Sequence, residues 1–409
     1  MNKKKTVYFS LSIVCILSVI FIVFYLLRQK GGSLLSKSDE TIDFVDARSR
    51  TFFPGKDGYY YKADDGLLKF FDFKTKQIAI VCNKANCKHL PWDEATPEEE
   101  RCDAFITAYR SVFVYDNKLY VMQYNDNLSM TVYRSELDRS HQELVADFGV
   151  NLLSRVFIKN NKMYYSNIIP EETVDEAGFP TVTGRQTNYI SMLDLKTKNV
   201  SKLTDSLIGY LSSISFLAMQ GNKIYYRYDY FENALKPDNS NWDEAKMHTE
   251  YYSFDVDSKE TMKEFENVKS DDLIVLEYIR GETLYYVTAD SKSAEKQTGG
   301  QSPDALYCSD GTTTNLLLSD VFISAIYDDK VFYTANKNED NTYYYDLKTS
   351  QSVELKTINN MHYVIIGESD EGFLVRVTDS TELEQGSSFM CYITKDDYYN
   401  GHYNFIRLD

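Results

Sequence analysis

The sequence predicts an all-β protein, a β-propeller of seven four-stranded blades preceded by one transmembrane helix. Three observations support this: an uncharged apolar run near the amino terminus, aromatic-rich runs that alternate with polar turns, and turn patterns that recur along the chain. The 409 residues include 34 Tyr and 23 Phe but only 7 Pro and 18 Gly. This composition indicates a globular chain and argues against disorder.

The first element is an apolar run from Val7 to Leu27 that contains no charge, proline or glycine. As a helix it spans about 30 Å, enough to cross the hydrocarbon core of a bilayer. A basic segment beginning at Arg28 follows, rather than the small-residue cleavage site of a signal peptide. We therefore predict a cytoplasmic tail at residues 1–5, a transmembrane helix at 6–27, a linker at 28–50 and a propeller domain at 51–409.

Charge restricts the partners of the large domain. The net charge is −17, and the first 30 residues hold five cations and no acid, so the rest of the chain carries −22. A domain this acidic is repelled by phosphate backbones, so we expect no nucleic acid partner. Lysines before the apolar run are balanced by basic residues after it, and the amino-terminal amine adds to the first side. We expect a single-pass protein of the cell membrane whose large domain is extracytoplasmic.

Two turn patterns define the repeat. A turn followed by an aromatic strand begins at Asp57, Asn117, Asn161, Asn222, Glu282, Asp329 and Glu371. Each copy is followed by a strand that ends in a tight turn of the type Asp-x-Lys-Thr, at Asp72, Asp138, Asp194, Asp255, Asp310, Asp346 and, more loosely, Lys395. Asp and Thr side chains bond to backbone amides at such corners. Four antiparallel strands that recur every 42 to 61 residues are typical of a β-propeller.

The blade number and the role of the aromatic residues each have an alternative. Six or eight blades follow if a weak unit is miscounted or if Thr41 to Val45 supplies a ring-closing strand. We interpret the aromatic stripe as core, because blades are covered on both faces; the alternative is a platform for carbohydrate.

Loop lengths distinguish the two faces of the predicted ring. The second connection within a unit is long at Ile169–Gln186, Phe231–Thr249 and Asp290–Pro303, and the longest link between units is Cys82 to Ala104. In an up-and-down unit these connections lie on one face, where binding residues usually occur. Trp242 and Phe179 are apolar residues within these polar loops, so we predict that they contact a ligand; the alternative is that they anchor the loops.

A cysteine cluster lies in the longest link. Cys82, Cys87, His89 and Cys102 are spaced C-x4-C-x-H-x12-C. Three thiols and an imidazole form the ligand set of a closed tetrahedral zinc site, which predicts a structural zinc ion that holds the loop together. The alternative is a disulfide between two of the three cysteines, as is common outside the cytoplasm.

The cysteine loop after the first Tyr-rich unit resembles a family of surface-anchored propeller proteins of Gram-positive gut anaerobes. The family is an uncharacterised domain of unknown function, related to propellers of the low-density-lipoprotein-receptor type, and the resemblance covers about residues 50 to 409. Many relatives are lipoproteins, whereas this chain has a plain apolar segment. The resemblance implies a propeller outside the cytoplasm and implies no activity.

Motifs of known enzymes are absent from the sequence. There is no G-x-S-x-G elbow, Walker loop or H-E-x-x-H pattern. We therefore predict a binding or scaffolding module that contacts a protein or glycan through its long-loop face, with no catalytic residue assigned. The alternative is a propeller-type carbohydrate-active hydrolase or lyase, whose acids come from separate blades.

Overall fold

A computed structural model describes residues 44–408, apart from positions 49–51, 56, 64, 94, 107–108, 125–128, 150–154, 175–179, 237–240, 266–267, 269–272, 290–303, 336–337, 356–360 and 380–387. The predicted tail, transmembrane helix and most of the predicted linker lie outside these residues. Within them, no helix is long and apolar enough to span a membrane.

The described chain is almost entirely β-structure, and every strand pairing is antiparallel. The first two sheets comprise β2 (Phe52–Pro54), β3 (Gly58–Lys62), β4 (Leu68–Asp72) and β5 (Ile78–Ile80), and then β6 (Tyr109–Tyr115), β7 (Lys118–Tyr124), β8 (Met130–Ser135) and β9 (Glu143–Asp147). The last sheet comprises β25 (Met361–Glu368), β26 (Gly372–Asp379), β27 (Ser388–Thr394) and β28 (Ile406–Arg407).

Two larger sheets lie between these, and in each one a long strand serves two neighbouring units. The first contains β10 (Arg155–Lys159), β11 (Lys162–Val174), β12 (Pro180–Asp194), β13 (Val200–Lys202), β14 (Leu207–Gln220), β15 (Lys223–Phe231), β16 (Met247–Asp255) and β17 (Thr261–Glu264). The second contains β18 (Leu273–Arg280), β19 (Thr283–Ala289), β20 (Asp304–Ser309), β21 (Thr314–Tyr327), β22 (Lys330–Ala335), β23 (Asn338–Asp346) and β24 (Gln351–Leu355). The start of β14 pairs with β12 and its remainder with β15, while β21 likewise pairs first with β20 and then with β22.

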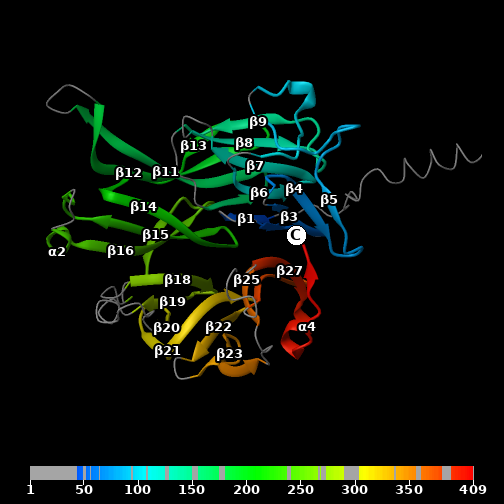
Figure 1. Ribbon diagram of the computed structural model, residues 1–409. Helices are drawn as coiled ribbons and strands as arrows, with labels where there is room; N and C mark the ends of the chain where they lie inside the picture. The colour runs from blue at the N-terminus through cyan, green and yellow to red at the C-terminus, as the bar shows by residue number, and fades with distance from the viewer. Residues whose placement is uncertain are drawn as a thin grey trace, which may run out of the picture.

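The sheets form a β-propeller. First strands of successive units contact one another, as in β2 with β6, β10 with β14, β14 with β18 and β21 with β25, and β25 returns to β2. Figure 1 shows the sheets around a common centre, with the strands of the first unit beside those of the last. At this junction the Tyr61 hydroxyl donates to the Leu408 carbonyl at 2.8 Å, and Phe73 stacks on Tyr392 with ring centroids 5.2 Å apart. The ring is therefore closed by side-chain packing between the first and last units.

The strand β1 (Phe44–Arg48) overlaps the segment suggested as a ring-closing strand, but it does not close the ring. It pairs antiparallel with β10, from Phe44 opposite Lys159 to Arg48 opposite Arg155, and not with the last unit. It therefore adds a strand to the inner edge of the third unit and leaves the closure to β2 and β25.

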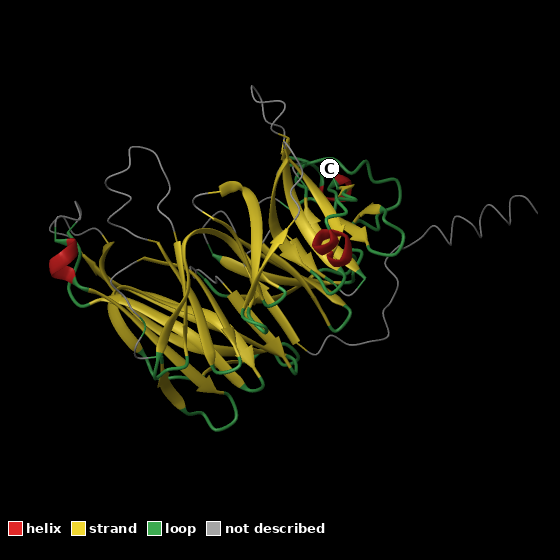
Figure 2. Ribbon diagram, turned by 90° about the horizontal axis from the view of Figure 1, so that it is seen from below, coloured by secondary structure: helices red, strands yellow, loops and turns green. Residues whose placement is uncertain are grey.

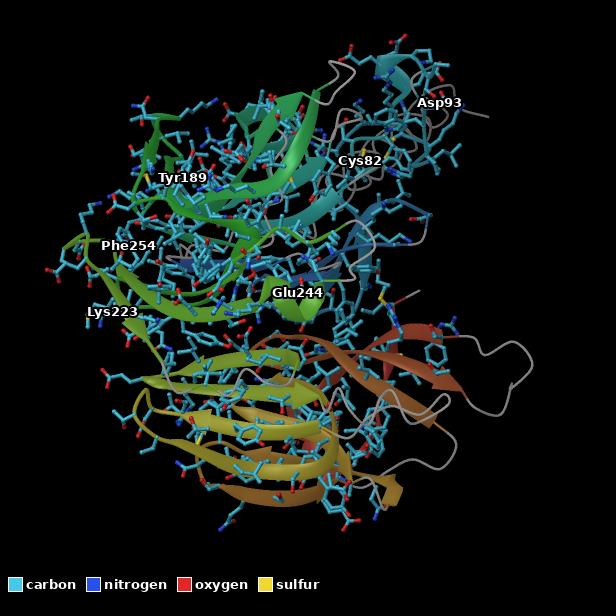
Figure 3. The ribbon with its side chains drawn as sticks, turned by 90° about the vertical axis from the view of Figure 1, so that its left-hand side faces the viewer. Cys82, Asp93, Tyr189, Lys223, Glu244 and Phe254 are labelled. Carbon is cyan, nitrogen blue, oxygen red and sulfur yellow. The ribbon has the colours of Figure 1, made fainter. Side chains whose placement is uncertain are left out.

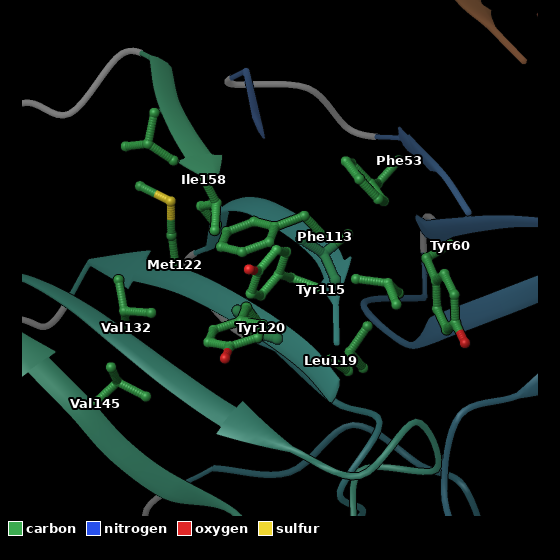
Figure 4. Close-up of a cluster of buried hydrophobic side chains, with 14 of the residues drawn as sticks. Phe53, Tyr60, Phe113, Tyr115, Leu119, Tyr120, Met122, Val132, Val145 and Ile158 are labelled. Carbon is green, nitrogen blue, oxygen red and sulfur yellow. The ribbon is translucent and has the colours of Figure 1, made fainter. Parts of the chain in front are cut away.

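The aromatic stripe is core, as predicted. The largest fully buried side chains include eight tyrosines and four phenylalanines. In the cluster shown in Figure 4, Phe113 and Tyr120 stack at 5.1 Å with ring planes 6° apart. Their strands, β6 and β7, are neighbours, so the aromatic runs fill the space inside and between units.

The turns between the first and second strands follow from their Asn, Asp and Gly residues. The turn pairs Asp116–Asn117, Asn160–Asn161 and Asp328–Asp329 all have positive φ, between 49° and 59°. Consecutive left-handed residues make the type I′ turn that suits the twist of a hairpin. The pattern that marked each unit in the sequence is therefore a hairpin turn.

The Asp-x-Lys-Thr turns also form as predicted. Oδ1 of Asp194 accepts the backbone N–H groups of Lys196 and Thr197 at 2.9 and 2.8 Å, and five of the other predicted corners show the same kind of contact: Asp72, Asp138, Asp255, Asp310 and Asp346. The seventh position differs, because α4 (Lys395–Asn400) occupies it and is capped by Oγ1 of Thr394, which accepts the N–H of Asp397 at 3.1 Å.

These turns predict an acid-sensitive contribution to stability. Backbone hydrogen bonds to the carboxylate hold the pKa of Asp194 and of Asp310 below the ordinary value. A depressed folded-state pKa stabilises the fold above the unfolded pKa of about 3.9, and this contribution is lost as pH falls through the folded value. We expect the fall in unfolding temperature from pH 7 to pH 3 to be smaller in an Asp194→Asn/Asp310→Asn variant than in the parent.

The control for this prediction is Asp205→Asn, which removes one exposed carboxylate outside these turns. It should leave the acid-induced fall unchanged. Differential scanning calorimetry at the two pH values measures both variants, and an equal fall in all three proteins would contradict the role assigned to the turns.

Candidate metal centre and the long-connection face

The cysteine loop leaves the first sheet at Val81 and rejoins the fold at Ile106. It packs on the connection between β3 and β4: the Leu68 N–H donates to the Ala104 carbonyl at 2.7 Å, and the Ile106 N–H donates to the Gly66 carbonyl at 3.1 Å. In an up-and-down unit this connection and the link to the next unit lie on the same face. The structure therefore places the loop on the face predicted from loop lengths.

The four predicted ligands converge. One ligand atom from each of Cys82, Cys87, His89 and Cys102 lies within 4.8 Å of all the others. Sγ of Cys102 is 3.6 Å from Nδ1 of His89. A tetrahedral zinc ion with Zn–S bonds of about 2.3 Å requires ligand atoms about 3.8 Å apart, so the donor set and its spacing fit zinc with small movements.

The loop has little apolar core of its own. Cys102 and Ala104 are buried against Leu67 of the β3–β4 connection, and Trp92 and Phe105 pack on this cluster with their two ring centroids 5.6 Å apart. Nε1 of Trp92 donates to the Cys102 carbonyl at 3.0 Å, so the indole covers the ligand backbone. The rest of the loop is held by turns and one short 3-10 helix, η1 (Glu98–Glu100). A metal ion would therefore replace a missing core.

Burial and hydrogen bonding shift the pKa values of two thiols in the cluster in opposite directions. Burial raises the pKa of Cys102 to about 12. Burial also pushes the pKa of Cys87 upward, but hydrogen bonds from the His89 backbone and the neighbouring thiols outweigh it and lower the pKa. Nζ of Lys84 lies 3.0 Å from a carboxylate oxygen of Asp103, which links the two ends of the loop. A thiol with a lowered pKa beside a buried one suits a cation that binds thiolates.

All five cysteines that the structure describes are free thiols. Cys308 lies on β20 and Cys391 on β27, two units apart; Cys391 is buried and Cys308 is half-buried. The sulfur–imidazole convergence involves all four side chains of the loop, whereas a disulfide would use two of them.

The long connections of the third and fourth units are more ordered than predicted. The segment Ile169–Gln186 is not a loop for most of its length, because β11 runs to Val174 and β12 begins at Pro180, which makes a projecting hairpin. The segment Phe231–Thr249 contains a short helix, α2 (Trp242–Ala245). Strand pairing continues past the body of the blade because Thr181 to Thr187 supply residues that favour strands.

Of the two predicted ligand-contact residues, Trp242 lies on this face and Phe179 lies outside the described residues. Trp242 is the first residue of α2, and its side chain is not among those described. Figure 2 shows α2 at the left-hand end of the molecule, away from the loops along its lower edge. In Figure 3, Lys223 of a tight turn lies at the left, Glu244 of α2 near the middle, and Cys82 and Asp93 of the cysteine loop toward the upper right.

Exposed apolar side chains gather on the projecting hairpin and its neighbours. Ile169 on β11 and Ile208 on β14 are 48% and 52% exposed, and both lie opposite Thr187 on the strand between them. Leu211, at the corner of β14, is 51% exposed, and Met247 at the start of β16 is 48% exposed. Several of the remaining exposed apolar residues are spread over outer strands, as with Val200, Met262 and Leu316. The projecting part of the third and fourth units is thus the place where such groups lie close together.

A buried ion cluster between the fourth and fifth units was not predicted. Arg227 on β15 contacts Asp229 at 2.8 Å and Glu277 on β18 at 2.6 Å, and the Tyr251 hydroxyl donates to Glu277 at 2.7 Å. Burial raises the pKa of Glu277 even though Arg227 opposes that shift. The residues are separated by about fifty positions and lie in ordinary strand patterns, so no signal in the sequence joined them.

No family model matches the chain, and no curated protein matches it. Among solved structures, the β-propeller domain of the Trilobed protease from Pyrococcus furiosus is similar, with 14% identity over 89% of this chain and 99% of that one and a TM-score of 0.49. An oligogalacturonate lyase in complex with manganese has 13% identity over 86% and 90% and a TM-score of 0.45. Pyrococcus horikoshii acylaminoacyl peptidase has 13% identity over 87% of this chain but only 53% of its own, and a TM-score of 0.49. Likenesses at this level do not bear on function.

Proposed function

We propose that this protein is a membrane-anchored, extracytoplasmic propeller of seven blades whose long-connection face binds a protein or a glycan. The observation that carries the proposal is the one-sided projection of the β11–β12 hairpin and α2, with exposed apolar side chains at Ile169, Ile208 and Leu211. Contiguous apolar groups on a polar surface are a feature of interaction sites. The blade count is supported by strand pairing, since the 27 strands from β2 to β28 divide into seven consecutive four-strand runs once β21 is shared by two of them.

The position of β1 supports the orientation of the proposed anchor. Phe44 lies opposite Lys159, at the tight-turn end of β10, and Arg48 lies at the other end. The chain that arrives from the predicted transmembrane helix thus reaches the propeller on its tight-turn face. The long-connection face is then directed away from the membrane, where a partner of the cell surface can reach it.

Acidic residues near the ring centre favour binding over catalysis. The first strands β2, β6, β10, β14, β18 and β25 carry two acidic side chains, Glu277 and Glu368, and the shared strand β21 carries Asp320. Glu277 is paired with Arg227, and Glu368 is 2.7 Å from Nζ of Lys395. Glu277 and Glu368 are each paired with a cation, so neither is free to serve as the acid or the base of a glycoside hydrolase.

The proposal includes a structural zinc ion held by Cys82, Cys87, His89 and Cys102. It is supported by the convergence of four ligand atoms in a loop without its own core. When bound, the ion would cross-link the two ends of the loop and keep it against the β3–β4 connection. We assign it no chemical step.

The binding face can be tested by charge substitution. We expect a full-length Ile169→Glu/Ile208→Glu/Leu211→Glu variant to lose partner binding, because three carboxylates prevent burial of the apolar surface, while its unfolding temperature stays close to that of the parent. Binding is measured with detergent-solubilised, labelled protein on glycan arrays and on arrays of cell-surface proteins.

The matched control is Val200→Glu/Met262→Glu/Leu316→Glu, which adds the same charge at residues of 58%, 53% and 54% exposure on outer strands. Retained binding in the control and its loss in the first variant support the assigned face. Equal binding by both variants would exclude this face, and turnover of an array glycan would favour the hydrolase or lyase alternative.

A further inference from the structure

A pocket lies on the tight-turn face between the third and fourth units, opposite the face discussed above. It is lined at its rim by Lys159, Lys162, Lys259, Asn160 and Asn222, and Tyr164 lies among its walls. Lys159 and Lys162 flank the first turn of the third unit, and Lys259 ends the Asp255 turn of the fourth. The pocket thus exists only because the turns of two successive units meet.

The polar groups of the pocket are arranged around Asn222. Nζ of Lys159 donates to the Gly221 carbonyl at 2.7 Å and to Oδ1 of Asn222 at 2.9 Å. The amide nitrogen of Asn222 in turn donates to the carboxylate of Asp257. These bonds fix one ammonium group at the wall of the pocket and hold the two turns together.

The other two lysines form no ion pair within the described part of the chain. Lys162 lies opposite Asp194 on β12 and adds to the backbone hydrogen bonds that lower the pKa of that carboxyl group, so its charge is partly compensated, whereas Asp257 is the one acidic residue among the lining residues. Three lysines and one acidic residue therefore line the pocket, in a protein whose net charge is −17. This is a local reversal of charge in a concave site, which concentrates anions there.

We propose that this pocket binds a phosphate group carried by a small molecule or by a phospholipid headgroup. Lysine binds phosphate as a point charge, and three such charges can each contact a different oxygen of a tetrahedral anion. The negative charge of the remaining surface repels long polyanions, so the ligand is a single phosphate ester and not a nucleic acid. The strand β1 begins beside the pocket, with Phe44 opposite Lys159, so the proposed membrane anchor would bring a phospholipid headgroup near it. This site is separate from the proposed binding face and does not depend on it.

The test uses the full-length protein in an uncharged detergent, with sn-glycerol 3-phosphate and monomeric dihexanoyl-phosphatidylglycerol as probes in isothermal titration calorimetry. We expect saturable binding of at least one probe. In a Lys162→Gln/Lys259→Gln variant we expect affinity to fall about tenfold or more, because two of three attractive charges are lost. Both side chains are exposed, so the variant keeps the unfolding temperature of the parent.

The matched control is Lys74→Gln/Lys236→Gln, which removes two exposed lysines far from the pocket in the chain and leaves the same net charge. Unchanged affinity in this control supports the pocket, and the tighter of the two probes identifies the source of the phosphate. The proposal is overturned if neither probe saturates, or if both variants weaken binding to the same extent.

Discussion

Replacement of Cys87 by serine is expected to reduce bound zinc from about one equivalent to almost none and to lower the unfolding temperature by about 5 °C or more. The thiol contributes one of four converging ligand atoms, and three remaining ligands bind zinc much more weakly. The loop then loses the contact that replaces its core, and the packing of Trp92 and Phe105 over Cys102 is lost with it. Inductively coupled plasma mass spectrometry and differential scanning calorimetry measure the two effects.

The control is Cys308→Ser, which removes a described thiol from β20, far from the cluster, and is expected to retain the zinc. Thiol titration of the unfolded parent protein separates the two alternatives for the loop. Zinc near one equivalent with all loop thiols reactive supports the metal. Absence of zinc with two thiols blocked establishes the disulfide and rejects the metal centre.

Local features of the chain could be predicted because they depend on neighbouring residues. The turn at Asn160–Asn161 and the corner at Asp194 each follow from side chains within three positions, and both form as expected. The cysteine loop was recognisable for the same reason, since its ligands lie within 21 residues. Short-range chemistry of this kind leaves a pattern that can be read along the sequence.

Features that depend on packing between units could not be predicted in the same way. Lys159 and Asn222 meet across two units, and Arg227 meets Glu277 in the next unit. None of these residues differs from its neighbours in type or spacing. The position of β1 was also not predictable, because a strand of five residues can pair with any free strand edge and its partner is decided by the space left inside the ring.

The largest loss of stability from a single substitution is expected at Arg227, which holds two carboxylates in a buried site. The side chains of Asp229 and Glu277 are 12% and 9% exposed. Burial lowers the pKa of Arg227, but the two carboxylates outweigh this effect, so the guanidinium stays charged. An Arg227→Met variant leaves both acids without their cation, and we expect the free energy of unfolding to fall by about 3–5 kcal/mol in urea titration at pH 7.

A second substitution tests whether the loss comes from uncompensated charge. Glu277→Gln in the Arg227→Met background removes one of the two unpaired carboxylates and leaves a side chain that can still accept from Tyr251, so we expect part of the lost stability to return. The same double variant should lose less stability as pH rises than Arg227→Met does, because burial raises the pKa of Glu277 and ionising it costs more without the arginine.

Arg185→Met provides the exposed comparison. It breaks a 3.8 Å pair with Glu171 in which both side chains are about half exposed, and it should change the free energy of unfolding by less than about 0.5 kcal/mol. If the Arg227 and Arg185 variants lose equal stability, or if Glu277→Gln deepens the loss, the cluster is held by packing and not by charge compensation.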